Sequence, residues 1–103
     1  MKILVVDDHE LIREALRTVL KQLKPQIVVF EASNSRQAMR VVEDHPDLSL
    51  VLLDINLPDR DGFSVLGELR ERYPTIAIIM LSASDDQDRV KRAFGLQSIA
   101  ILD

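Results

Sequence analysis

The chain has 103 residues, enough for one domain, and because apolar residues make up 47% of it and aromatic residues 4%, its small core is predicted to be aliphatic. The net charge of −4 argues against nucleic-acid binding by this segment, and the absence of cysteine excludes disulfides and thiolate zinc sites. No apolar run approaches the ~20 residues of a membrane span, and the N-terminus lacks the pattern of a signal peptide, so we expect a cytoplasmic protein without membrane contact.

The first segments of the chain predict a strand followed by a helix. Residues 2–6 form a short apolar run rich in branched side chains, which stops at Asp7 and Asp8 and is typical of a buried strand. Apolar residues then recur at helical spacing over residues 11–23, and Pro25 ends that helix.

The middle of the chain predicts two strands with a helix between them. Residues 27–32 and 49–54 are apolar runs of strand length. Asn34 or Ser35 can cap the intervening helix, which breaks at the sequence DHPD. The apolar side chains expected to face the core from this helix are Ala38, Met39, Val41 and Val42.

The remainder predicts two helices and one strand. Gly62 begins a helix that ends near Tyr73 and Pro74. Its inward side chains are expected to be Phe63, Leu66 and Leu69. Residues 76–81 predict a fourth strand, and the highly charged segment 85–94 predicts a short helix.

The order of these elements predicts the fold class. Strands alternate with helices, and the strands are solidly apolar, as in a parallel sheet covered on both faces. Because crossovers between parallel strands are right-handed, the expected architecture is an α/β doubly wound parallel sheet.

Acidic residues end two of the predicted strands. Asp7 and Asp8 end the first, Asp54 ends the third, and Ser82 follows the fourth. Ligands of a doubly wound sheet bind at the carboxyl ends of its strands, and the first and third strands are expected to be neighbours there. Three carboxylates that close cannot all stay ionised in isolation, so the cluster predicts Mg²⁺. A magnesium site of this kind predicts a phosphoryl group, with Asp54 as the nucleophile.

Each of these residues also has a simpler interpretation. Asp54 alone can be a solvated turn residue, and the pair Asp7 and Asp8 alone can cap a helix. His9 follows the pair directly, but a residue of the first helical turn more often faces solvent. The combination of acids at the ends of separate strands is what makes the phosphoryl-transfer hypothesis specific.

Three motifs resemble the receiver domain of two-component response regulators. They are ILVVDDHELIREAL, VLLDINLPDRDGF and IIMLSAS, and the similarity runs from residue 1 to about residue 93. The opening motif is most similar to receivers that precede a helix-turn-helix DNA-binding output domain. The resemblance implies a flavodoxin-like fold with strand order 2-1-3-4-5.

The resemblance also implies a role for the residues that match the motifs. Asp54 matches the phosphoacceptor. Asp7 and Asp8 match the acidic pair that holds Mg²⁺, with Asp8 as the usual direct ligand. Asn56 matches the position whose backbone carbonyl binds the metal.

Two further positions match the phosphate-binding part of the family pattern. Ser82 matches the hydroxyl residue that contacts the phosphoryl group and moves on activation, and Ala83 matches the small residue that leaves room for that group. The implied phosphodonor is a histidine kinase or phosphotransfer protein, and the implied output is regulation of transcription. Such a domain is not an enzyme, beyond Mg²⁺-dependent self-phosphorylation and slow self-dephosphorylation.

The sequence departs from the family pattern after residue 93. No lysine follows Lys91, the aromatic switch position falls on Ile101, and residues 98–102 are expected to form an altered fifth strand without a fifth helix. We therefore expect residues 1–103 to be a receiver domain that is incomplete at its C-terminus, with weakened phosphorylation. The apolar surface that the fifth helix would cover predicts a homodimer, which can include exchanged elements.

Two other functions remain open at this stage. The first is a degenerate receiver that serves only as a dimerisation or protein-interaction module, because the phosphate-binding lysine and fifth helix are absent. The second is a phosphohydrolase of the haloacid dehalogenase type, which requires a second aspartate two residues after the nucleophile. Asn56 occupies that position, so the sequence disfavours the hydrolase.

Overall fold

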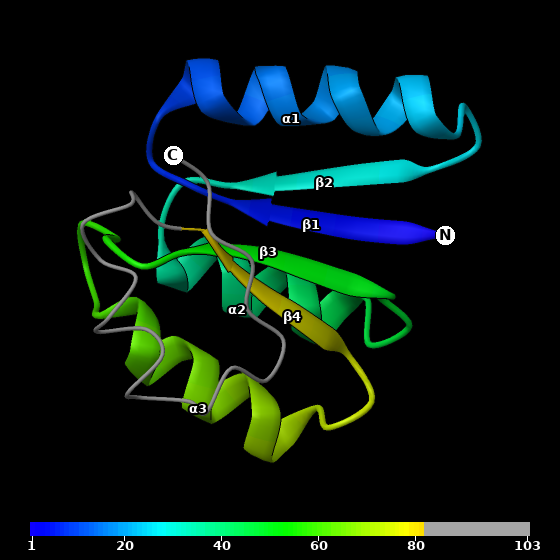
Figure 1. Ribbon diagram of the computed structural model, residues 1–103. Helices are drawn as coiled ribbons and strands as arrows, with labels where there is room; N and C mark the ends of the chain where they lie inside the picture. The colour runs from blue at the N-terminus through cyan, green and yellow to red at the C-terminus, as the bar shows by residue number, and fades with distance from the viewer. Residues whose placement is uncertain (82–103) are drawn as a thin grey trace.

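A computed structural model describes residues 1–81 of the chain. Four parallel strands form one sheet in the order β2-β1-β3-β4 (Figure 1). The strands are β1 (Lys2–Val6), β2 (Val28–Ala32), β3 (Leu50–Asp54) and β4 (Ala77–Leu81). The prediction of a doubly wound parallel sheet is confirmed, including the adjacency of the first and third strands. The predicted helix 85–94, the predicted strand 98–102, Ser82 and Ala83 lie outside the described residues.

Helices cover the two faces of the sheet unequally. The helix α1 (Glu10–Leu23) lies alone on one face among the described residues, whereas α2 (Ser35–Asp44) and α3 (Gly62–Arg72) lie together on the other (Figure 1). The predicted bounds of all seven elements hold to within one residue, apart from the less sharply defined helix ends. Asn34 is the cap of α2, because its side chain accepts a hydrogen bond of 2.9 Å from the Gln37 N–H.

The main core lies between the sheet and the helices α2 and α3. Alternate strand residues point to this face, since successive side chains of a strand point to opposite sides. Leu4, Val6, Val51 and Leu53 are all fully buried there. The helix residues buried against them are Ala38, Val42, Val65, Leu66 and Leu69. Of the side chains expected inward, Met39, Val41 and Phe63 are only partly buried.

The helix α1 is less deeply packed than its apolar pattern suggests. None of its residues is buried, and only Leu16 and Leu20 pack against the smaller core on its face. Leu11 is 78% exposed and Leu23 is 70% exposed. The helix α1 contacts β1 and β2, and no other helix among residues 1–81 lies beside it on that face (Figure 1). No helix among residues 1–81 is long and apolar enough to cross a membrane.

Candidate functional site

The carboxyl ends of β1 and β3 bring three acids together. The two strands are paired up to Val6 and Leu53, so the residues that follow them leave the sheet side by side. One ligand-type atom from each of Asp7, Asp8, His9 and Asp54 lies within 4.8 Å of the others. The predicted proximity of the three carboxylates is therefore confirmed, and His9 joins them.

The Asp54 carboxyl group sits in an unfavourable place for a negative charge. Its pKa is raised from the usual 3.8 to about 6, chiefly because burial penalises the charged form and also because the carboxylates of Asp7 and Asp8 repel it. The Asn56 N–H donates a hydrogen bond of 3.1 Å to Asp54 Oδ1, which opposes this shift. Burial and the two neighbouring carboxylates together therefore disfavour the charged form of Asp54.

His9 is an unexpected member of the acidic cluster. Its Nδ1 atom lies 2.8 Å from Asp7 Oδ1 and 3.0 Å from Asp8 Oδ1, and its backbone N–H donates to the same Asp7 oxygen at 2.8 Å. The hydrogen bond to Asp7, followed by the charges of Asp8 and Asp7, raises the pKa of His9. The interpretation of His9 as a solvent-facing residue is thus incomplete: its side chain is 68% exposed, but its ring nitrogen contacts both carboxylates. The position of His9 directly after the acidic pair was the feature of the sequence that could have indicated this contact.

The donor set fits a hard divalent cation. Three carboxylates offer the oxygen ligands that Mg²⁺ prefers, and one ligand atom from each lies within 4.8 Å of the others. Asp7 is almost fully buried at 6% exposure, whereas Asp8 and Asp54 are open to solvent enough to be reached. Asp7, Asp8 and Asp54 are the side chains that would hold the ion.

The loop after Asp54 folds back tightly on the end of β3. The Gly62 N–H donates a hydrogen bond of 2.9 Å to the Ile55 carbonyl oxygen, and Asp61 caps α3 by accepting a bond of 2.8 Å from the Phe63 N–H. A Cβ atom at Gly62 would lie 2.6 Å from the carbonyl oxygens of both Asp54 and Ile55, so this approach requires glycine. The loop places Asn56 beside Asp54, and the role of its carbonyl as a metal ligand stays a prediction.

Asp59 connects the same loop to the start of α2. Its carboxylate accepts hydrogen bonds of 3.0 Å from the Ser35 N–H, 2.7 Å from Ser35 Oγ and 3.3 Å from the Arg36 N–H. These bonds lower the pKa of Asp59. A carboxylate at the N-terminus of a helix satisfies its unpaired N–H groups and interacts favourably with its dipole. Asp59 therefore fixes the loop that carries Asn56 against a second element of the fold.

Replacing Asp59 by alanine is expected to lower the free energy of unfolding by about 1 kcal/mol, the usual value of a helix cap. Because the pKa of Asp59 is lowered on folding, this stabilisation is present above the unfolded-state pKa and disappears as the pH falls through the folded-state value. Urea unfolding of both proteins at neutral and acidic pH measures the effect. Asp47→Ala is the matched control, since Asp47 forms an exposed ion pair with Lys2 and its removal should cost clearly less stability. Equal losses for the two variants would contradict the capping role.

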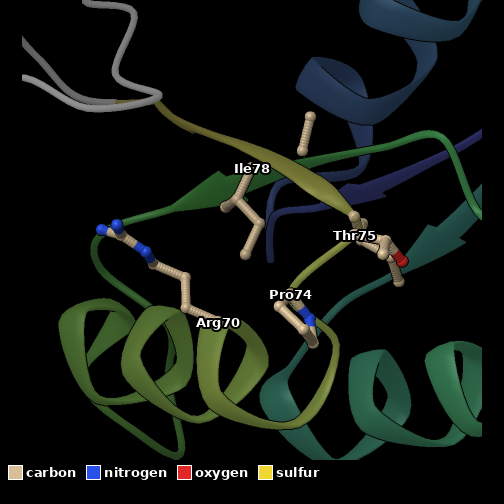
Figure 2. Close-up of a pocket in the computed structure, with 6 residues that line it drawn as sticks. Arg70, Pro74, Thr75 and Ile78 are labelled. Atoms are coloured by element: carbon tan, nitrogen blue, oxygen red, sulfur yellow. The ribbon is translucent and has the colours of Figure 1, made fainter.

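A separate pocket lies near the amino ends of the strands, away from the carboxyl ends that carry the acidic cluster. It has a volume of about 440 Å³ and lies between the end of α3 and the start of β4, and Figure 2 shows Arg70, Pro74, Thr75 and Ile78 around it. Binding sites of doubly wound sheets lie at the carboxyl ends of the strands. This pocket flanks the amino end of β4, so we do not assign it to the functional site.

Comparisons with known proteins agree with the geometry. A family model described as the response regulator receiver domain matches residues 3–102, so the match continues past residue 93, where the recognised motifs end. The chain is 36% identical to the glycerol metabolism activator of Pseudomonas putida, over 98% of this chain and 46% of that protein. It is 34% identical to the nitrate/nitrite response regulator protein NarL of Escherichia coli, over 88% of this chain and 42% of that protein.

Solved structures give the same result for the fold. The crystal structure of a two component transcriptional regulator AraC from Clostridium phytofermentans ISDg matches with a TM-score of 0.83 at 26% identity. That match covers 99% of this chain and 79% of the other. The chain spans less than half the length of the curated relatives named above, at 46% and 42%.

Proposed function

The chain belongs to the response regulator receiver domain family, and from this premise we propose that it takes a phosphoryl group from a phosphohistidine onto Asp54, with Mg²⁺ held by Asp7, Asp8 and Asp54. Receiver domains are signalling modules of response regulators, which act with histidine kinases or phosphotransfer proteins. The single observation that supports the proposal most is the proximity of Asp7, Asp8 and Asp54, with one ligand atom from each within 4.8 Å of the others. The proposed domain comprises residues 1–103, of which the family model matches residues 3–102.

The proposed transfer is a direct displacement at phosphorus. An oxygen of the Asp54 carboxylate forms the new P–O bond, and the P–N bond to the donor imidazole breaks, so the imidazole nitrogen leaves with the bonding electron pair. With a pKa of about 6, Asp54 is mostly ionised at neutral pH and can act as nucleophile. The Asn56 N–H holds one of its oxygens in place. When bound by Asp7, Asp8 and Asp54, Mg²⁺ would neutralise charge on the phosphoryl oxygens.

Ser82, Ala83 and Asn56 complete the proposal. Their roles are those implied by the family: the Ser82 hydroxyl contacts the phosphoryl group, Ala83 leaves room for it, and the Asn56 carbonyl binds the metal. The output is proposed to be transcription, because the named relatives are an activator, a response regulator and a transcriptional regulator. We propose that, without a kinase, the domain carries out only Mg²⁺-dependent self-phosphorylation and slow self-dephosphorylation. We also propose that the protein is cytoplasmic.

Phosphoryl incorporation tests the proposal directly. The protein is treated with acetyl phosphate and Mg²⁺, and intact-mass spectrometry measures the phosphorylated fraction. We expect incorporation by the wild type, none by Asp54→Asn, and wild-type incorporation by Asp47→Asn, which removes an exposed acid outside the site. A wild type that is never phosphorylated, or an Asp54→Asn protein that is, would refute the assignment.

A degenerate receiver is the second candidate function. One observation favours it: among the described residues, α1 exposes the apolar side chains of Leu11, Ile12, Val19 and Leu23. In this alternative the domain forms a homodimer, with or without exchanged elements, and does not require phosphorylation. Beryllofluoride with Mg²⁺ mimics the phosphoryl group, so saturable binding supports phosphotransfer. A dimer by light scattering that is indifferent to beryllofluoride supports the alternative.

Replacing His9 by alanine is expected to strengthen Mg²⁺ binding at pH 6 by roughly two- to fivefold, and to have a smaller effect at pH 8. The pKa of His9 is raised, so at pH 6 the ring is an imidazolium that repels the cation and occupies oxygens of Asp7 and Asp8. As the pH rises through the His9 pKa, this competition disappears. Calorimetric titration with Mg²⁺ at both pH values measures it. An effect of the same size at pH 8 would show that His9 acts by packing and not by charge.

A further inference from the structure

We propose that Arg13 is a positioning residue for the metal site, holding the peptide between Asp7 and Asp8 so that both carboxylates project toward Asp54. This inference rests on the proposed function, since it concerns the acids assigned to Mg²⁺. It is drawn from a hydrogen-bond network that joins the end of β1 to α1 and β2.

The main chain of Asp7 is held from two sides. Its N–H donates a hydrogen bond of 3.0 Å to the Ala32 carbonyl oxygen, which continues the pairing of β1 with β2 beyond the last strand residue. Its carbonyl oxygen accepts a bond of 2.7 Å from Arg13 Nη1. Because a peptide unit is planar, fixing the carbonyl of Asp7 also fixes the N–H and the Cα atom of Asp8, from which its side chain extends.

Arg13 is itself fixed by an acid on the neighbouring strand. Its Nε donates to Glu31 Oε1 at 3.2 Å, and Arg17 Nη1 donates to the other oxygen, Glu31 Oε2, at 2.8 Å. The Arg13 side chain is 16% exposed, compared with 46% for Arg17. A guanidinium presents several donors in a rigid plane, so one side chain can bind the Asp7 carbonyl and the Glu31 carboxylate together. Lysine has a single ammonium and cannot reproduce this fork.

The network gives Arg13 and Arg17 different roles, despite their similarity. Both are arginines of α1, one turn apart, and both contact Glu31. Of the two, Arg13 also contacts the peptide that carries the acidic pair. Groups that orient metal ligands without touching the metal change metal affinity when they are removed. The structure therefore assigns this orienting effect to Arg13 and not to Arg17.

Calorimetric Mg²⁺ titration of the full chain tests the assignment. We expect Arg13→Ala to weaken Mg²⁺ binding about tenfold, and Arg13→Lys to weaken it by an intermediate factor. Arg17→Ala is the matched control, because it removes the same charge from the same helix, and its Mg²⁺ affinity should stay within about twofold of the wild type. Equal weakening by Arg13→Ala and Arg17→Ala, or wild-type affinity of Arg13→Lys and Arg13→Ala, would overturn the proposal.

A second readout does not depend on metal. In the metal-free proteins, ¹⁵N relaxation should give the Asp8 amide a rigid order parameter in the wild type and in Arg17→Ala, and a lower one in Arg13→Ala and Arg13→Lys. If Arg13→Ala does not fold, Arg13→Lys decides both measurements. A wild type that takes up no Mg²⁺ would refute the proposed function, whereas an unchanged Asp8 order parameter in the Arg13 variants would refute the positioning role.

Discussion

Replacing Gly62 by alanine is expected to lower the free energy of unfolding by roughly 3 kcal/mol or more, the upper range for an added group without space. The new methyl group would lie 2.6 Å from the carbonyl oxygens of Asp54 and Ile55 and 2.7 Å from the Ile55 Cα atom. All three are backbone atoms, so no side chain can rotate to make room. The chain must move the start of α3 away from the end of β3, which also breaks the Gly62 N–H bond to Ile55. Denaturant unfolding measures the loss.

Gly67 provides a matched control in the same helix. It is exposed, and a Cβ atom there would meet no heavy atom within 4 Å. Because alanine is the better helix former, Gly67→Ala is expected to raise stability by about 0.5–1 kcal/mol. Opposite signs for the two substitutions are therefore expected. A Gly62→Ala protein as stable as the wild type would show that the turn after Asp54 is not as closely packed as the structure has it.

Neutralising Asp54 is expected to stabilise the metal-free protein at neutral pH. The pKa of Asp54 rises from 3.8 to about 6 on folding, and each unit corresponds to about 1.4 kcal/mol. Since the Asp54 carboxyl group is only half-buried, solvent screening reduces the free energy that corresponds to the full pKa shift. We therefore expect Asp54→Asn to raise the free energy of unfolding by about 1.5 kcal/mol at pH 7.5. An asparagine can still accept the hydrogen bond from the Asn56 N–H. Urea unfolding in the presence of a chelator measures the difference.

Because folding raises the pKa of Asp54, the free energy of unfolding is expected to fall as the pH rises. Between pH 3.8 and about 6 the folded protein binds the Asp54 proton more tightly than the unfolded chain. The stabilisation that comes from this tighter proton binding is fully present below pH 3.8 and is lost as the pH rises through the folded-state pKa of about 6. Mg²⁺ should restore it in the wild type at pH 7.5 and do less for Asp54→Asn. Asp47→Asn is the control, since the pKa of Asp47 is lowered and its neutralisation should give no gain. A wild type whose stability rises with pH across this window would contradict the prediction.

The parallel sheet was accessible to sequence reasoning because its two central strands bury both faces. Residues 3–6 and 50–53 are apolar throughout, so the sequence alone indicated both that they form strands and that they are buried. The order of the strands followed from the handedness of crossovers and from the motifs, and it placed Asp54 beside Asp7. For α1 the same reasoning was less informative. A helical pattern of apolar residues identifies a helix but not how much of its surface has a partner, and Leu11 is mostly exposed.

The interactions that position the site were not accessible in the same way. Asp59 contacts Ser35 across 24 positions of sequence, and Arg13 contacts Glu31 across 18. Neither pair has a local spacing that distinguishes it from ordinary exposed charges. Gly62 could be recognised as the first residue of a helix, but the reason for a glycine lies in the approach of Ile55. These are tertiary contacts, so only coordinates show them.

The helices on the two faces of the sheet are expected to differ in local stability. The helices α2 and α3 each contribute several fully buried side chains, whereas α1 contributes none. Regions with few buried apolar contacts open at lower free energy than the rest of a protein, as separate cooperative units. Native-state hydrogen exchange should therefore show α1 opening before the other helices. Since α1 begins directly after Asp8 and His9, each opening would also release the acidic pair, so occupancy of the cluster and closure of this helix would favour each other.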